Sequence, residues 1–167
     1  DSTYQVTVLR TMGASPSTGI GTITFSGTQN RCIWSIAEFD NVDTSGVNGE
    51  GAIVQAVGSV NEVGGSGTLT VVLGAFGDSG NATYGGLSSP SSSGTLSSGA
   101  GFTNILTSGV IEAAQQGNTE WRTDNATNVT WTDTNNGGFQ AVAVEIKNAT
   151  QAGGITISFK SLLGVGR

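Results

Sequence analysis

The stretch "AVAVEIKN", residues 141–148, carries apolar side chains on both faces of an extended chain and ends in a polar turn. A second stretch, "WSIAEFDN" at residues 34–41, follows the same pattern, with Glu38 in the place of Glu145. A strand that is apolar on two faces is typical of a sheet that is covered on both sides. These two stretches therefore predict central strands of a layered β-structure.

Short stretches of alternating apolar and polar residues recur along the rest of the chain, separated by turns rich in Gly, Ser and Asn. Helix is nearly missing from the pattern, and its best candidate, "VIEAAQQGN" at residues 110–118, is too short to stand alone. We predict an all-β fold, an antiparallel β-sandwich in the form of a jelly roll with about ten strands. The predicted strands are 3–10, 21–27, 32–39, 52–60, 68–73, 82–87, 101–111, 119–123, 128–133, 139–147 and 155–163.

The chain of 167 residues suits a single domain, which we place over residues 1–167. The stretch 87–102 is rich in Ser and Gly, and we interpret it as a long surface loop because strands continue on both sides of it. The tail 152–167 contains a further predicted strand, which could dock on a neighbouring subunit.

The composition excludes several classes of function. The sequence contains no histidine, which removes the usual general base and most catalytic zinc sites. Six scattered basic residues against a net charge of −6 argue against nucleic-acid binding, and no apolar run is long enough for a membrane span. We expect no cofactor. The one cysteine, Cys32, is most simply a buried apolar residue.

Carboxylate pairs are the remaining route to catalysis. Glu38 and Glu145 could act as acid and base of a glycoside hydrolase if their carboxyl groups lay about 5 to 9 Å apart. The alternative is that each glutamate ends a strand, solvated or paired with a basic residue. We favour the alternative, with "RCIWSIAEF" (31–39) as a central core strand, and expect no enzymatic activity.

The turn that follows this strand, "DNVDTSGVNGEG" at residues 40–51, offers oxygen ligands of the kind that calcium prefers. They are Asp40, Asp43, Asn48 and Glu50. Their spacing is not that of an EF-hand loop, and we expect no metal site. Asp40 and Asp43 are predicted to cap the turn by accepting hydrogen bonds from its backbone amides.

Aromatic side chains near Asn and Asp suggest a second kind of site. Trp121 and Trp131 flank an Asn-rich turn, and together with Tyr84 they are weak candidates for stacking on a sugar ring. This hypothesis requires that the rings lie exposed on one concave face. The alternative is a hairpin whose tryptophans pack inward or against a neighbouring subunit.

Four stretches of the chain carry framework motifs: "GTITFSGTQNRCIWSIAEFDNVDTSGVNGEGAIVQ", "LTVVLGAFGDSGNATYGGL", "TEWRTDNATNVTWT" and "GGFQAVAVEI". Together they resemble a jelly-roll module of phage and phage-like virion structural proteins, of the capsid-decoration or fibre type. The resemblance covers roughly residues 18–147 and involves framework motifs, so no functional residue is carried over from it.

The resemblance implies a non-enzymatic protein on the virion surface that decorates the capsid or forms part of a fibre. Its expected partners are copies of itself, in a homotrimer, and other virion proteins such as the major capsid protein. The alternative is a carbohydrate-binding module, either a receptor-binding fibre tip that recognises a cell-surface glycan or a secreted bacterial domain. Neither hypothesis involves nucleic acid or a membrane.

Overall fold

The computed structural model shows an all-β chain and describes residues 5–12, 22–28, 32–61, 67–90, 94–106, 110–112, 115–134, 138–149, 155–158 and 164–166. The helical segment at Val47–Ala52 consists of 3₁₀ turns that meet at Asn48 and Gly49, both with positive φ. The strands are β1 (Cys32–Trp34), β2 (Glu38–Asp40), β3 (Ile53–Asn61), β4 (Gly67–Val72), β5 (Ala82–Ser89), β6 (Leu96–Ser98), β7 (Thr103–Asn104), β8 (Val110–Glu112), β9 (Gln115–Arg122), β10 (Asn128–Asp133), β11 (Phe139–Ile146), β12 (Thr156–Ser158) and β13 (Gly164–Gly166).

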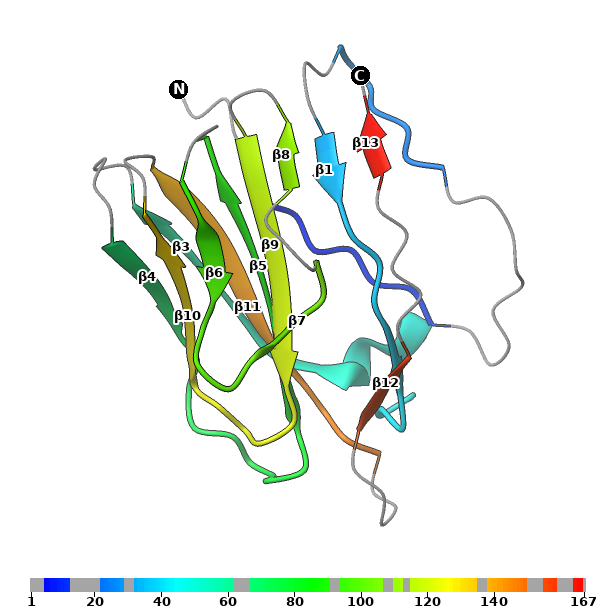
Figure 1. The fold of residues 1–167 in the computed structure, drawn as a ribbon. Helices are drawn as coiled ribbons and strands as arrows, with labels where there is room; N and C mark the ends of the chain where they lie inside the picture. The colour runs from blue at the N-terminus through cyan, green and yellow to red at the C-terminus, as the bar shows by residue number, and fades with distance from the viewer. Residues whose placement is uncertain are drawn as a thin grey trace.

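Two antiparallel sheets pack against each other as a β-sandwich (Figure 1). The large sheet has the strand order β3-β11-β5-β9-β7, and β8 pairs with the same edge of β9 as β7 does. The small sheet has the order β4-β10-β6. The predicted β-sandwich of about ten strands is therefore confirmed.

The strands are paired in a nested order. β3 pairs with β11, β4 with β10, and β5 with β9, so that early strands meet late strands in reverse sequence. Two further pairings, β11 with β5 and β10 with β6, join these pairs into the two sheets. Each sheet is consequently built from both halves of the chain.

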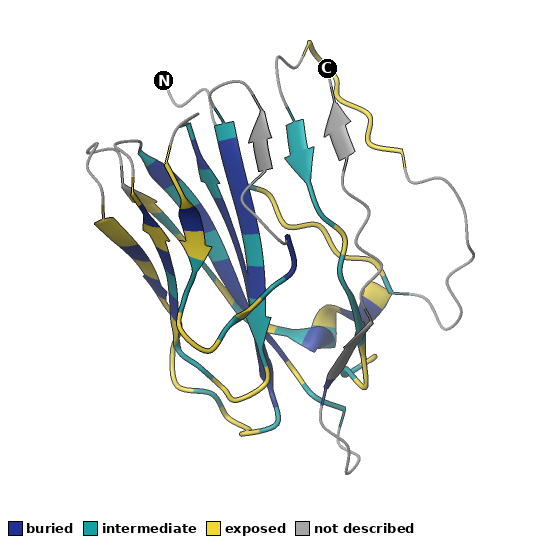
Figure 2. Ribbon diagram, viewed as in Figure 1, coloured by how far each residue is buried: buried dark blue, intermediate teal, exposed yellow. Residues whose placement is uncertain are grey.

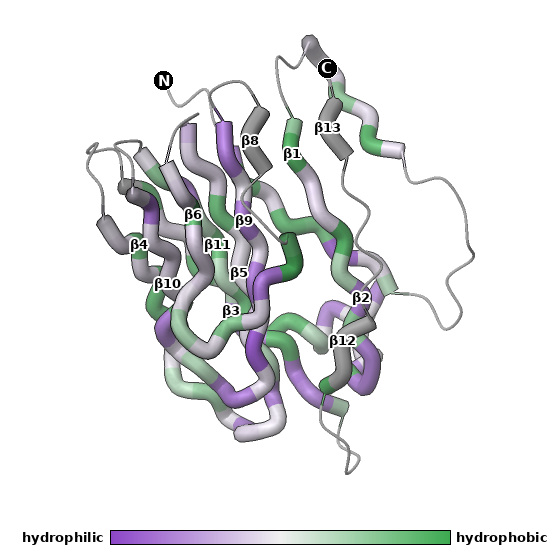
Figure 3. Tube along the Cα trace, in the orientation of Figure 1, coloured by the Kyte–Doolittle hydropathy of each residue, from purple (hydrophilic) through white to green (hydrophobic). Residues whose placement is uncertain are grey.

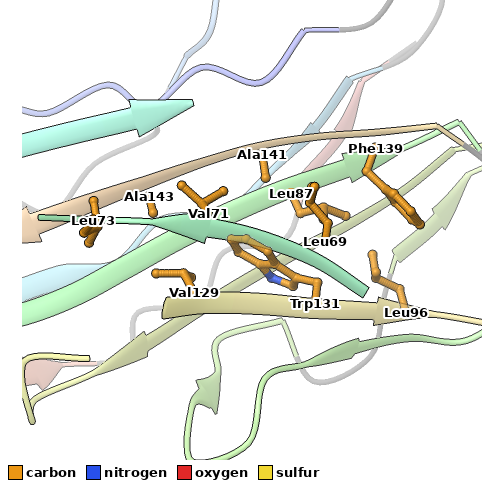
Figure 4. Close-up of a cluster of buried hydrophobic side chains, with 10 residues drawn as sticks. All are labelled: Leu69, Val71, Leu73, Leu87, Leu96, Val129, Trp131, Phe139, Ala141 and Ala143. Atoms are coloured by element: carbon orange, nitrogen blue, oxygen red, sulfur yellow. The ribbon is translucent and has the colours of Figure 1, made fainter. Parts of the chain in front are cut away.

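The space between the two sheets is filled by apolar side chains from β4, β5, β6, β10 and β11 (Figure 4). Trp131 lies at the centre of this cluster with 1% of its surface exposed. A Cβ atom at Gly85 would lie 2.7 Å from the indole Cζ2 of Trp131 and from Cγ1 of Val129. Glycine at this position of β5 therefore lets the indole pack directly against the backbone of the large sheet.

The other face of the large sheet is covered by a separate layer (Figure 1). This layer contains two short antiparallel pairs, β1 with β13 and β2 with β12. Phe39 of β2 packs edge-on against Tyr84 of β5, with the ring centroids 5.7 Å apart. The central strands are consequently buried on both sides, as their dark blue colour in Figure 2 shows.

Several strand predictions are confirmed within one or two residues, including 52–60, 68–73, 128–133 and 139–147, which correspond to β3, β4, β10 and β11. The prediction for 32–39 as a central core strand is wrong. This stretch forms β1 and β2, which belong to the covering layer and are separated at residues 35–37. Ile33 of β1 and Phe39 of β2 face the large sheet, whereas the other residues of the two strands are half-buried or exposed.

The strand predictions for 3–10 and 21–27 are also wrong. Their described parts lie in no strand, and Ile23 and Phe25 are exposed. The stretch 110–118, judged too short to stand alone as a helix, contributes in its described residues to β8 and β9.

The remaining organisational predictions concern the loop and the tail. The stretch 87–102 contains the end of β5 and all of β6, so its described residues are only in part a loop, and residues 91–93 lie outside the described ranges. In the tail 152–167, β12 and β13 pair with β2 and β1 of the same chain. The tail therefore docks, in its described parts, on its own domain.

We predict that Gly85→Ala lowers the free energy of unfolding by about 1–3 kcal/mol, because the added methyl group overlaps the Trp131 indole. Urea denaturation followed by tryptophan fluorescence measures this change. Gly67→Ala in β4 is the matched control, since a Cβ there meets no atom of the described residues within 4 Å. Equal unfolding midpoints for the two variants would show that the packing of the Trp131 indole does not require glycine at position 85.

Candidate functional site

The structure does not bring the two candidate catalytic glutamates together. Glu145 of β11 lies on the face of the large sheet that meets the small sheet, because it is two residues from Ala143, which belongs to the apolar cluster between the sheets. Glu38 belongs to β2, which covers the opposite face of the large sheet. The sheet therefore separates the two residues, and the arrangement required for a glycosidase pair is not formed.

Glu145 instead organises a buried polar network. Its carboxylate accepts hydrogen bonds from Nδ2 of Asn81 at 2.5 Å and from Nε2 of Gln55 at 2.6 Å. Gln55 also accepts a bond from the backbone N–H of Gly74, and Asn81 accepts one from the backbone N–H of Asn148. The network holds the connection between β4 and β5 to the ends of β3 and β11, and it satisfies a fully buried carboxylate.

Glu120 of β9 is the described acidic residue with the most unusual environment. Its side chain is fully buried, and Oε2 accepts a hydrogen bond of 2.9 Å from the backbone N–H of Gly99. Oε1 has no hydrogen-bond partner among the described residues. Burial raises the pKa of Glu120 to about 7, and the donors at Gly99 and Ser98 oppose this shift only in part.

Glu120 ends a row of buried polar side chains on β9. Gln116, Asn118 and Glu120 alternate along the strand and are all buried, so β9 is dark blue in Figure 2 but carries purple segments in Figure 3. Oδ1 of Asn118 accepts hydrogen bonds from Nε1 of Trp131 and from Oγ of Ser98, both at 3.2 Å. This row lies between the two sheets and ties β9 to β6 and β10.

Sequence reasoning missed this row because its signal is misleading. Polar residues at alternate positions of a strand ordinarily indicate the solvent-facing side. In β9 the polar side is covered by the small sheet, while Trp121 on the other side is only half-buried. A raised pKa and an incompletely bonded carboxyl can indicate catalysis, but the described residues place no second carboxylate in contact with Glu120.

The three aromatic candidates for sugar binding do not share an exposed face. Trp131 lies between the two sheets. Tyr84 has 9% of its surface exposed and lies on the other side of the large sheet. Trp121 pairs with Tyr84 across neighbouring strands and packs edge-on against Phe39. The expected exposure is therefore wrong for Trp131 and Tyr84. Trp131 packs inward, as the alternative proposed, but β9 and β10 belong to different sheets and do not form the hairpin of that alternative.

The acidic turn after β2 is held by Asp43. Oδ1 of Asp43 accepts a hydrogen bond of 2.8 Å from the backbone N–H of Ser45, and Oδ2 pairs with Nζ of Lys147 at 2.6 Å. These partners hold the pKa of Asp43 well below its ordinary value. The predicted capping role of Asp43 is confirmed, and among the described residues no group of three Cys, Asp or Glu side chains is placed to hold a metal ion.

Large apolar side chains are exposed mainly outside the interior strands. Of the nine exposed large apolar residues that the structure describes, seven lie on the extended segments 5–12 and 22–28 or on the edge strands β3 and β4. Val6 of the first segment lines a shallow groove with Val60 of β3 and Val142 of β11. No helix in the described ranges has the length and hydropathy of a membrane span. The nine residues are Val8, Leu9, Ile23, Phe25, Ile36, Val47, Val54, Val60 and Val72.

No family model matches this chain, and neither a curated protein nor a solved structure matches it. The functional role of the buried polar groups and of the exposed apolar residues is therefore argued from their geometry alone.

Protonation of Glu120 is expected to stabilise the fold. Because its pKa rises from 4.5 to about 7 on folding, the folded state binds the proton more tightly than the unfolded state does. This stability is fully present below pH 4.5 and is lost as the pH rises through about 7, by as much as about 3 kcal/mol. Denaturant unfolding at a series of pH values measures the loss.

Glu120→Gln is expected to remove most of this pH dependence, whereas Glu50→Gln, at an exposed position, is expected to keep it. The lowered pKa values of Asp43 and Asp124 act below the ordinary aspartate value of 3.8 and so fall outside the same window. An unchanged pH profile in Glu120→Gln would contradict the assignment.

Proposed function

We propose that this protein is a non-enzymatic structural protein of a phage virion, which decorates the capsid or forms part of a fibre. The nested strand order supports this proposal. Pairing of β3 with β11, β4 with β10 and β5 with β9, joined by β11–β5 and β10–β6, is the order of a jelly roll. Jelly rolls are common in viral capsid proteins, and sandwiches of this kind also serve as lectin domains.

The observation that carries the proposal is the position of the exposed apolar side chains. Leu9 is 83% exposed on the extended segment 5–12 and Phe25 is 46% exposed on the extended segment 22–28, and the described residues of both segments join no sheet. Extended segments with exposed large side chains are suited to lie on a neighbouring subunit, where burial of apolar area drives association. The proposed mechanism is therefore assembly.

The surface chemistry also favours assembly over catalysis. Only 11% of the residues are charged, so that contacts between subunits desolvate few ions. The buried carboxylate of Glu145 is bonded to side chains that hold the fold together. The proposed partners are further copies of the chain, in a homotrimer, and other virion proteins such as the major capsid protein.

We predict that the purified protein has the native mass of a trimer or a larger homo-oligomer and keeps it after moderate heating. Leu9→Ser with Phe25→Ser is expected to lower this mass, because it removes apolar side chains from the proposed contact. The fold should be kept, because both side chains lie outside the domain core. Sedimentation velocity gives the mass, and circular dichroism checks that the variant still folds. Ile36→Ser, at an exposed apolar residue outside the segments 5–12 and 22–28, is the matched control and is expected to leave the mass unchanged because the proposed contact is made by those two segments.

A clean monomer for the unmodified protein at high concentration, together with no binding to emptied phage capsids, would overturn the proposal. Binding to such capsids by the monomer would retain the virion role and reject the homotrimer.

A further inference from the structure

Strand β3 is an edge of the large sheet. It pairs with β11 on one side, and no described residue pairs with its other side. Its nine residues contain no charged residue and no proline. Charged residues and proline are the usual devices that keep a free edge from pairing with another chain. From Gln55 to Asn61 it follows β11 in unbroken register, so the free edge presents a regular row of backbone donors and acceptors.

The side chains of β3 alternate between two environments. Gln55, Val57 and Ser59 are half-buried, whereas the residues between them are exposed. Val54 and Val60 are 50% and 58% exposed, and on their face of the strand only the small residues Ala56 and Gly58 lie between them. These four exposed residues therefore have a valine at each end and lie symmetrically about Val57.

We propose that the free edge of β3 pairs antiparallel with β3 of a second copy, about a two-fold axis at Val57. In this register Val54 lies opposite Val60 of the second copy, and Ala56 lies opposite Gly58. A two-fold axis perpendicular to the sheet places the exposed faces of both copies on the same side, so exposed residues meet exposed residues. The two large sheets then form one continuous sheet.

A second copy is the occupant that this pattern favours. A contact about a two-fold axis requires a surface that is complementary to itself, and the equal distance of the two valines from Val57 meets this requirement. The charge distribution also favours a second copy. Each copy carries a net charge of −6, so two copies associate best through an uncharged surface. Strand β3 is uncharged, and so is the neighbouring edge strand β4.

This contact does not depend on a virion role. It adds a two-fold axis to any other association that the subunits make. With the proposed homotrimer it would join trimers in pairs, and without the homotrimer it would produce a dimer.

Disulfide cross-linking tests the register, in a Cys32→Ala background that removes the native thiol. Residues opposite each other in antiparallel strands have Cα atoms about 4.5–5.5 Å apart, which suits a disulfide. Val57→Cys alone should give a cross-linked dimer under mild oxidation. A mixture of Val54→Cys protein with Val60→Cys protein should cross-link as well, and both of these positions are exposed, so folding is preserved.

The single variants provide matched controls. Two copies of Val54→Cys place their thiols about six residues apart along the strands, roughly 20 Å, and should not cross-link with each other. The same holds for two copies of Val60→Cys. Independently, Val60→Lys should reduce the native mass measured by sedimentation, because two ammonium groups then flank the shared edge.

Cross-linking of Val54→Cys with itself would overturn the register. Failure of both the Val57→Cys protein and the mixed pair to cross-link would overturn the proposal, as would an unchanged mass for Val60→Lys. These outcomes are separate from the test with Leu9 and Phe25, so either contact can be rejected while the other stands.

Discussion

The packing of the Trp131 indole on the backbone of β5 at Gly85 fixes the relation between the two sheets. The indole reaches the large sheet only because β5 carries no side chain at that point, and its N–H then requires an acceptor inside the sandwich. Asn118 of β9 provides this acceptor and binds Ser98 of β6 with the same oxygen. One aromatic side chain thus determines the spacing of the sheets and the presence of a polar group between them.

The central strands of the large sheet are covered on both faces, so their polar residues must find partners within the protein. Glu145 finds them in Gln55 and Asn81, and Asp133 accepts a hydrogen bond from Ser89. Glu120 has one carboxyl oxygen without a hydrogen-bond partner among the described residues, and burial raises its pKa. Glu145, one of the two acidic candidates from the sequence, consequently connects strands.

Local patterns predicted those strands whose alternation matches one buried and one exposed face, as in β4, where Leu69 and Val71 point inward. They also identified β11 as a central strand. The patterns failed where the covering element is distant in sequence. Residues 34–41 and 141–148 look alike, but β11 lies at the centre of a sheet, while among the described strands β2 pairs with β12 alone. The buried face of β9 was hidden for the same reason, since nothing near Asn118 or Glu120 in the chain indicates that β6 and β10 cover them.

The nested strand order also affects how the chain folds. Ser88 and Gln115, in the inner pair of β5 with β9, are 27 residues apart, whereas Gln55 and Glu145, in the outer pair of β3 with β11, are 90 residues apart. Because closing a longer loop costs more entropy, the inner pair can form first, and the pairing then extends outward. During synthesis, β3 and β4 emerge from the ribosome early but must wait for β11 and β10. Over this interval both uncharged strands lack their own partners, and neighbouring nascent chains are the nearest substitutes.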